Sequence, residues 1–348
     1  MPLLAPAGAA GAQGAPVPPS GANLNQQTLA NLLAAMQGEA YAYAKYDAYR
    51  QVAGGSLAAL WSRTANTELR DHFAGFAAAY KLAGTNAANL QAAVAGENYE
   101  TTLMYPAFAA RAAAAGDKQA AQLFNEIAAD EADHRDGFAQ ALAAVTTGGS
   151  IPAPPTVQRV RIVVSTSNVS AQTKNDLLAA MHGEAFAHAK YLAYAQAARA
   201  RGQVRLAQLF TGTSNVELRE HFAAEANLAG LAGNSRANLL DAVSGETSEA
   251  TVLYPDAAQQ AYTSGERAFA TCSWKQRATK LITRRTSSAL SGPSCGRGPS
   301  RLNGMRSGQQ VAEWRAAANL ARATSTTAAG LSVSTVPSTS RSRPARSR

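Results

Sequence analysis

The sequence has very few cysteines: two among 348 residues, Cys272 and Cys295, both near the C-terminus. They form no C-x-x-C pair, which excludes zinc ribbons and rubredoxin-type iron sites built from such pairs. Long hydrophobic runs are also missing. No apolar stretch approaches the roughly 18 residues of a membrane span, so we expect no membrane partner. Hydrophobic residues still make up 46% of the chain, and much of this is alanine, which favours helices with small, closely packed faces.

Acidic residues are nearly absent from residues 271–348, which contain 14 lysines and arginines against a single acid, Glu313. The formal charge of +9 therefore divides into +13 for this tail and −4 (18 − 22) for the rest of the chain. A positive charge confined to the tail says nothing about the folded part, so we expect no nucleic-acid partner. Residues 267–348 are predicted to form a basic, low-complexity and disordered tail.

The N-terminal residues 1–23 lack the basic start and the full apolar core of a secretory signal peptide. We therefore expect a flexible leader and a cytoplasmic protein. A remnant of an export signal is the alternative.

The chain repeats itself, and the repeat determines the predicted architecture. The segment LLAAMQGEAYAYAKY at 32–46 returns as LLAAMHGEAFAHAKY at 177–191, and NTELRDHFA at 66–74 returns as NVELREHFA at 215–223. The segment NLQAAVAGENYETTLMYP at 89–106 returns as NLLDAVSGETSEATVLYP at 238–255. The first pair is offset by 145 residues (177 − 32) and the other two by 149 (215 − 66 and 238 − 89).

Glycines divide the first repeat into four predicted helices, near 24–53, 57–83, 87–115 and 118–145, with breaks at Gly54, Gly84 and Gly116. Helices of this length and spacing form a four-helix bundle. We therefore predict an all-α protein of two tandem bundles. The first occupies residues 24–145, a linker occupies 146–170, and the second, which lacks its fourth helix, occupies 171–266.

Each predicted helix of the first repeat carries acids or histidines on a face that is otherwise apolar or small. They are Glu39 with Tyr46 seven positions later, Glu68 and His72 at i,i+4, Glu97 and Glu100 at i,i+3, and Glu131 and His134 at i,i+3. Any one pair is common on a solvated helix, but their joint occurrence on four successive helices is not. Five carboxylates in a bundle core need compensating positive charge. Two divalent cations provide it, and this ligand set suits two iron ions, with manganese as the alternative.

The motifs GEAYAYAKY, GENYETTLMYP and DEADH resemble the rubrerythrin branch of the ferritin-like superfamily, over roughly 28–145 and, incompletely, 173–265. The resemblance implies ferritin-like bundles. It makes Glu39, Glu97 and Glu100 terminal ligands, Glu68 and Glu131 bridging ligands, and His72 and His134 the remaining ligands of two irons. It also implies a redox-dependent shift of one iron between Glu100 and an imidazole. The catalytic candidates are Glu100, Tyr46 and Tyr105.

Two features depart from the pattern of that family. The second-helix pair is spaced Glu68-x-x-x-His72 rather than E-x-x-H, and the spacing recurs as Glu217 and His221; Asp71 is the alternative to Glu68. The four cysteines of the family's rubredoxin-like domain are missing, so we expect an external electron donor, either rubredoxin-like or a flavoprotein. The family's exchange of helices between subunits makes a homodimer a further expectation.

The second repeat carries an incomplete ligand set: Glu184, Glu217, His221, Glu246 and Glu249. At the offset of 149 its remaining ligands would be Lys280 and Thr283, within TKLIT. Codons for that pentapeptide, read one base earlier, admit Asp-Glu-Ala-Asp-His, and residues 271–273 admit the preceding Leu-Phe. We therefore hypothesise a one-base frameshift upstream, which the nucleotide sequence tests. His188, at i+4 from Glu184, is either a substitute ligand or a core histidine.

The expected function is that of a di-iron oxidoreductase of the peroxidase type, which reduces hydrogen peroxide under oxidative stress. One alternative is a ferroxidase or iron-handling protein, in which the same site oxidises Fe(II). The other is a helical scaffold whose degenerate site has lost its metal. Metal analysis of the purified protein separates the scaffold from the other two.

Overall fold

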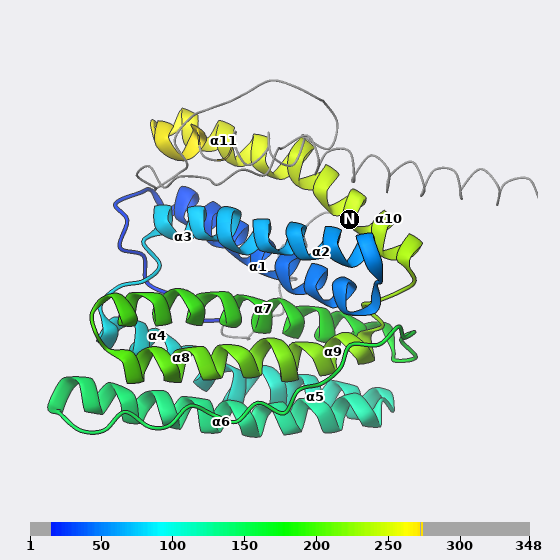
Figure 1. Cartoon of the computed structure of the whole chain (residues 1–348), viewed down its shortest axis with the longest axis horizontal. Coiled ribbons are helices and arrows are strands. Elements are labelled where there is room, and N and C mark those ends of the chain that lie inside the picture. Colours follow the sequence, from blue (N-terminus) through cyan, green and yellow to red (C-terminus); the bar gives the residue numbers. More distant parts are fainter. Residues whose placement is uncertain (1–14, 272, 274–348) are drawn as a thin grey trace, which may run out of the picture.

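The computed structural model describes residues 15–271 and Ser273, and every regular element within them is a helix (Figure 1). The prediction of an all-α protein is confirmed. No helix in this described part of the chain is both long and apolar enough to cross a membrane.

The helices of each half form hairpins, close to the predicted boundaries. Hairpin 1A consists of α1 (Gln26–Val52), α2 (Gly55–Thr67), the π-helical segment η1 (Glu68–Phe73) and α3 (Ala74–Tyr80). Hairpin 1B consists of α4 (Asn86–Tyr99), η2 (Glu100–Met104), α5 (Tyr105–Ala115) and α6 (Lys118–Thr147). Hairpin 2A consists of α7 (Ala171–Ala200), α8 (Val204–Val216), η3 (Glu217–His221) and α9 (Phe222–Ala229). The chain continues through α10 (Ser235–Ser248), η4 (Glu249–Leu253) and α11 (Tyr254–Thr263).

Polar caps and glycine account for the helix ends. The side chains of Asn25 and Thr85 accept hydrogen bonds from backbone amides in the first turns of α1 and α4. Helix α5 ends at Gly116, whose φ of 82° lies in the left-handed region that glycine adopts without steric cost. The same type of ending at α3 uses Lys81, with φ 53°. The predicted break at Gly84 therefore falls three residues too late.

A π-helical segment interrupts two helices of each half and explains the Glu-x-x-x-His spacing. Segments η1 and η3 begin at Glu68 and Glu217, and each contains a histidine four residues later. A π turn contains one residue more than an α turn. The glutamate and the histidine four residues later therefore remain on the same face of the helix. Glu68 and His72 are both buried, whereas Asp71, the alternative ligand, is exposed.

The hairpins of the two halves are interleaved. Hairpin 1B contacts hairpin 2A, through α4 and α5 against α7 and through α6 against α9. Hairpin 1A contacts α7 on one side and α11 on the other. In Figure 1, α10 and α11 lie at the top, hairpin 1A below them, hairpin 2A below that, and α6 at the bottom. One complete four-helix bundle therefore consists of hairpins 1B and 2A.

This arrangement differs from the expected bundle of residues 24–145, because hairpin 2A lies between hairpins 1A and 1B. Each hairpin has one face that it buries only against another hairpin. Hairpins 1A and 2A carry the same motifs, so either of them offers hairpin 1B the same contacts. Helical periodicity identifies the buried face of a hairpin but not the partner that covers it.

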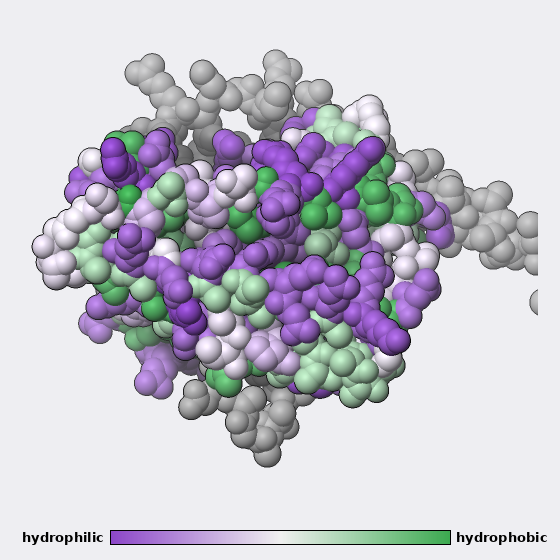
Figure 2. Space-filling view, turned by 90° about the horizontal axis from the view of Figure 1, so that it is seen from below, coloured by the Kyte–Doolittle hydropathy of each residue, from purple (hydrophilic) through white to green (hydrophobic). Residues whose placement is uncertain are grey.

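The outer face of the complete bundle carries many hydrophilic residues. Figure 2 shows the molecule from below, the side on which α6 lies in Figure 1; hydrophilic residues are spread across this face, with hydrophobic groups between them. On the opposite side of α6, Phe138 packs against Tyr191 and Phe210, with ring centroids 5.1 and 5.3 Å apart. The apolar stripe of α6 therefore faces hairpin 2A.

Two segments that were expected to be irregular pack closely on the helices. Residues 15–23 of the predicted leader are held at Tyr80, whose hydroxyl donates to Pro18 O (2.7 Å) and whose carbonyl accepts from the Ser20 hydroxyl (2.7 Å). The linker runs along hairpin 2A, where the Val160 amide donates to the Arg219 carbonyl (2.9 Å). Part of the predicted leader therefore forms a strap that packs on the helices.

The last described residues begin a further helix. Residues 267–271 are helical, and Phe269 packs on Phe76 with ring centroids 6.4 Å apart. Position 267 corresponds to Lys118, the first residue of α6, at the offset of 149 (118 + 149). Lys280, Thr283, the hypothesised frameshift product and the predicted disorder of the tail lie outside the described residues.

His188 lies in the core and belongs to none of the candidate metal-binding groups among the described residues. Its Nδ1 atom lies 2.7 Å from the Ser214 carbonyl, and its ring stacks on Tyr43 with centroids 5.4 Å apart. The residue is 3% exposed. Burial, with a smaller contribution from the charge of Arg219, lowers its pKa from 6.5 to about 4.

We expect the free energy of unfolding to fall as the pH drops from about 6.5 to about 4, because unfolded His188 takes up a proton that the folded state refuses. The full contribution of this residue is roughly 3 kcal/mol. Urea denaturation of the wild type and of His188→Phe at both pH values measures it, since the variant lacks this titration. An equal pH dependence in the two proteins contradicts the assignment.

Candidate metal centre

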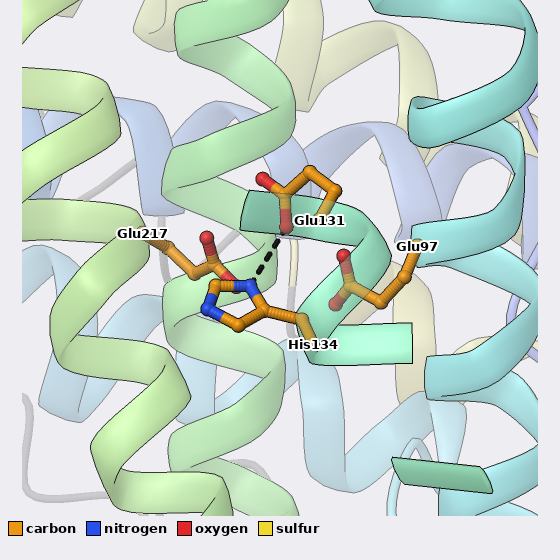
Figure 3. Close-up of side chains that lie close together, drawn as sticks. All are labelled: Glu97, Glu131, His134 and Glu217. Carbon is orange, nitrogen blue, oxygen red and sulfur yellow. Dashed lines mark hydrogen bonds and ion pairs between the residues drawn. The ribbon is translucent and has the colours of Figure 1, made fainter. Parts of the chain in front are cut away.

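Six buried side chains from hairpins 1B and 2A converge in the core of the complete bundle. They form two overlapping groups with ligand atoms within 4.8 Å of one another: Glu97, Glu131, His134 and Glu217, and Glu131, Glu184, Glu217 and His221. Figure 3 shows the first group, in which Glu97 reaches in from α4, Glu131 and His134 from α6, and Glu217 from η3. Either group could hold a metal ion.

Glu131 and Glu217 lie between the two imidazoles. The Nδ1 atom of His134 is 2.7 Å from Glu131 and 3.4 Å from Glu217. The Nδ1 atom of His221 is 3.0 and 3.2 Å from the same two carboxylates. Glu184 lies 3.7 Å from His221 Nδ1 and has no contact of this kind with His134. The centre thus has two shared carboxylates, and each end adds one imidazole and one glutamate.

Tyrosine hydroxyls from the opposite half hold the outer glutamates. Tyr191 of hairpin 2A donates a hydrogen bond to Glu97, and Tyr105 of hairpin 1B donates one to Glu184. Hydrogen bonds of this kind orient a ligating carboxylate. Both bonds join the two halves of the chain, so the centre is also part of what holds them together.

Glu100 lies at the edge of the centre. Its side chain is in hydrogen-bond contact with Glu97. It also lies beside Gly183, the residue before Glu184; a Cβ at that glycine would be 3.6 Å from Glu100 Oε1. Burial, and next the negative charge of Glu131, raises the pKa of Glu100 to about 8.

Several ligand atoms of the centre are buried and make no well-aligned hydrogen bond among the described residues, although some of them lie at ion-pair distance from one another. They are Glu97 Oε2, Glu131 Oε1, Glu184 Oε2, both carboxylate oxygens of Glu217, and His221 Nδ1. A buried polar atom without a partner costs about 1–3 kcal/mol. Bound cations would satisfy all of these atoms at once, and the oxygen-rich donor set with two imidazoles is one that iron and manganese accept. The residues present therefore fit metal ions.

The protonation of the centre leads to the same conclusion. Burial opposes the charged form of His134, but Glu217 and Glu131 outweigh it and raise the pKa of His134 to about 10. Burial acts to raise the pKa of Glu131, yet the imidazoles of His221 and His134 lower it overall. Burial, with Glu131 next, raises the pKa of Glu97 well above 4.5. Without metal, bound protons therefore offset the carboxylate charge.

Metal binding is expected to release about two protons or more near pH 7, because the ligating histidines must lose the protons that their raised pKa values retain. Affinity therefore weakens as the pH falls. Titration of the metal-free chain with Fe(II) in weakly buffered solution with a pH indicator measures the release. Binding without proton release, or with an affinity that is constant between about pH 6 and 9, contradicts this charge assignment.

Glu39, Glu68 and His72 form a separate cluster in hairpin 1A. The Nδ1 atom of His72 is 2.6 Å from Glu68 and 3.4 Å from Glu39. Tyr254 donates to Glu39. The remaining predicted site residues also lie outside the complete centre. Tyr46 donates a hydrogen bond to Glu246 (2.7 Å), and Glu249 is the first residue of η4. This cluster is the counterpart of the half that hairpin 2A contributes to the complete centre.

The structure thus divides the ligands predicted for the first repeat between two clusters. Glu97, Glu131 and His134 meet Glu184, Glu217 and His221 from the second half, with Glu100 beside them. Glu39, Glu68 and His72 lie in the other cluster. The expected single-repeat site is therefore replaced by one to which both halves contribute. Of the catalytic candidates, Glu100 and Tyr105 adjoin the complete centre, whereas Tyr46 bonds Glu246 outside it and Tyr191 takes the corresponding place at the centre.

Glu225 is a residue of the centre that sequence reasoning missed. It is fully buried, and its Oε1 lies 3.0 Å from the Tyr105 hydroxyl oxygen, whose proton is directed at Glu184. Burial raises the pKa of Glu225 well above 4.5. The available signal was its position four residues after His221, on the same helical face; the corresponding residue of the first repeat is Phe76 (225 − 149).

The family model for rubrerythrin matches residues 30–142. A rubrerythrin from Porphyromonas gingivalis is 34% identical over 139 residues, which cover 35% of this chain and 69% of the relative. A nigerythrin from Nitratidesulfovibrio vulgaris is 31% identical over 119 residues, which cover 30% of this chain and 58% of the relative. No solved structure matches the chain. Three ligands of the complete centre, Glu184, Glu217 and His221, lie outside the matched residues 30–142.

Proposed function

The chain belongs to the rubrerythrin family, and on this premise we propose that it is a di-iron oxidoreductase that reduces hydrogen peroxide to water. The observation that carries the proposal is the set of six buried ligands with unsatisfied atoms in the core of one bundle. When bound, two ferrous ions would supply one electron each, which matches the two electrons that peroxide requires. Manganese fits the same donor set less specifically.

The residues of the centre would bind the metals and supply protons. Glu131 and Glu217 would bridge the two metal positions, since each lies within 3.4 Å of both imidazoles. Glu97 with His134 and Glu184 with His221 would complete the two positions. Tyr105 links Glu184 to the buried carboxyl of Glu225, whose raised pKa favours a proton held beside the centre. Peroxide reduction consumes protons, so a protonated carboxyl at that place suits the reaction.

Electrons would come from a separate protein. The sequence has two cysteines and no pair of C-x-x-C motifs, so it cannot form the four-cysteine iron site of a rubredoxin. A rubredoxin-like protein or a flavoprotein is the expected donor. A homodimer is not needed to complete the described centre, because both halves of one chain contribute to it.

The test is peroxide reduction by the iron-loaded full chain. After anaerobic reduction, one equivalent of hydrogen peroxide should oxidise one pair of irons, and a chemical reductant should sustain turnover. Glu131→Ala, which removes a shared carboxylate, should abolish both. Oxidation and accumulation of excess Fe(II) without reductant-driven peroxide consumption would indicate an iron-handling protein instead. A chain that retains no iron after anaerobic loading would indicate a scaffold.

A further inference from the structure

A cavity of about 310 Å³ lies beside the metal centre, between α4 and α7 and under the strap of residues 15–19. Glu100 and Lys190 are the charged residues that line it; Ala92 and Gly96 are among the small ones. Because Glu100 contacts Glu97, the cavity adjoins the ligands of the centre directly. It is therefore a place where a small molecule can lie next to the metals.

Lys190 is a buried cation that forms no hydrogen bond or close ion pair with any described residue. It is 8% exposed, and the acid that it influences, Glu100, interacts with it only through its charge across the cavity. Its Nζ atom lies over the ring of Tyr191, 4.6 Å from the centroid, and 3.4 Å from the position that a Cβ on Gly96 would take. A buried ammonium group gains from an anion that it can contact directly.

The equivalent lysine in the first half of the chain, Lys45, does have an anionic partner. Lys45 occupies the equivalent position in α1 (190 − 145), and its Nζ lies 3.8 Å from the position of a Cβ on Gly245, the counterpart of Gly96. Lys45 forms a 2.7 Å ion pair with Asp241 of α10. The residue of α4 that corresponds to Asp241 is Ala92 (241 − 149), which lines the cavity. The cavity beside Lys190 therefore includes the space that the Asp241 carboxylate occupies beside Lys45.

We propose that Lys190 and this cavity form a binding site for a small inorganic anion, and that hydroperoxide, formed when hydrogen peroxide releases one proton to solvent on binding, is the member of this class that the centre uses. The ammonium donates hydrogen bonds to the anion, and Glu100, which contacts Glu97, forms the wall toward the centre. The strap of residues 15–19 covers the site from outside. The choice of hydroperoxide rests on the proposed function, whereas the anion site itself does not.

Bromide tests the anion site, because it is a poor ligand for iron and its position can be determined by anomalous scattering. Crystals of the metal-loaded full chain soaked in bromide should contain an ion in the cavity in contact with Lys190. Lys190→Met removes the charge, and Ala92→Asp introduces the carboxylate that Lys45 already has; both should remove the ion. Lys45→Met is the matched control and should leave it. An empty wild-type cavity, or bromide that survives in Lys190→Met, overturns the proposal.

Peroxide kinetics test the identity of the physiological ligand. The second-order rate constant for hydrogen peroxide should fall about ten-fold in Lys190→Met and in Ala92→Asp, since each loses a charge-assisted hydrogen bond, while iron content stays unchanged. Lys45→Met should match the wild type. Unchanged rates in both variants overturn the assignment of hydroperoxide. A wild type without peroxide turnover refutes the proposed function, and the bromide result still decides the anion site.

Discussion

Replacement of His221 by alanine is expected to remove the metal pair from the chain, whereas replacement of His72 by alanine is expected to leave it in place. His221 lies within 3.2 Å of both shared carboxylates, Glu131 and Glu217, while His72 contacts Glu39 and Glu68 in the other cluster. Loss of a ligating imidazole should weaken binding by more than about a hundred-fold, since even changes to residues behind a ligand cost 10–100-fold. Metal binding by the ligands of hairpin 1B would thus depend on a histidine from the second half of the chain.

Iron analysis after anaerobic loading and desalting measures this difference. His221→Ala should retain none of the pair, and His72→Ala should lose at most the ion that its own cluster could hold. Circular dichroism serves as the control that both variants keep their helices. The reverse result, in which His72→Ala loses the pair and His221→Ala keeps it, would restore a site built within the first repeat.

The first half on its own, residues 15–148, is expected to form a homodimer with one complete centre in each of two bundles. Hairpin 1A carries Glu39, Glu68 and His72 in the places of Glu184, Glu217 and His221 of hairpin 2A. Hairpin 1A of one copy can therefore take the place of hairpin 2A against hairpin 1B of the other. The apolar faces that the exchange buries are those of a bundle core, so the dimer should be obligate.

Light scattering with size-exclusion chromatography gives the mass, which should be twice that of one copy, with no monomer at about 10 µM. Iron loading should give about four ions per dimer. The matched control is the full chain, in which hairpin 2A already covers hairpin 1B. A stable monomer of residues 15–148 that binds a metal pair would contradict the interleaved arrangement.

The sequence predicts the parts of this fold that depend on local chemistry. Breaks such as Gly116, apolar periodicity and polar caps locate the helices, because each acts over a few residues. The ligand types also follow from local patterns, since acids on an otherwise apolar face need a counter-charge. The Glu68-x-x-x-His72 spacing is itself a signal of the π turn that the structure contains at this place.

Partner choice could not be predicted in the same way. The buried faces of hairpins 1A and 2A are nearly equivalent. No residue pattern therefore predicts which of the two packs against hairpin 1B. Glu225 was missed because its counterpart is Phe76, and the comparison between repeats drew attention only to what recurs. Lys190 was missed for the opposite reason: it does recur as Lys45, and the difference lies in Ala92 of another helix.

The interleaving has a consequence for the order of events during synthesis. Hairpin 1B leaves the ribosome before hairpin 2A has been synthesised. The bundle of these two hairpins, and the metal centre in it, therefore cannot form until about 80 more residues have been made. During that interval a nascent chain can pair with hairpin 1A of a neighbouring copy on the same messenger. Slow elongation through the linker would favour such entanglement, and rapid completion of α7–α9 would favour the monomeric fold.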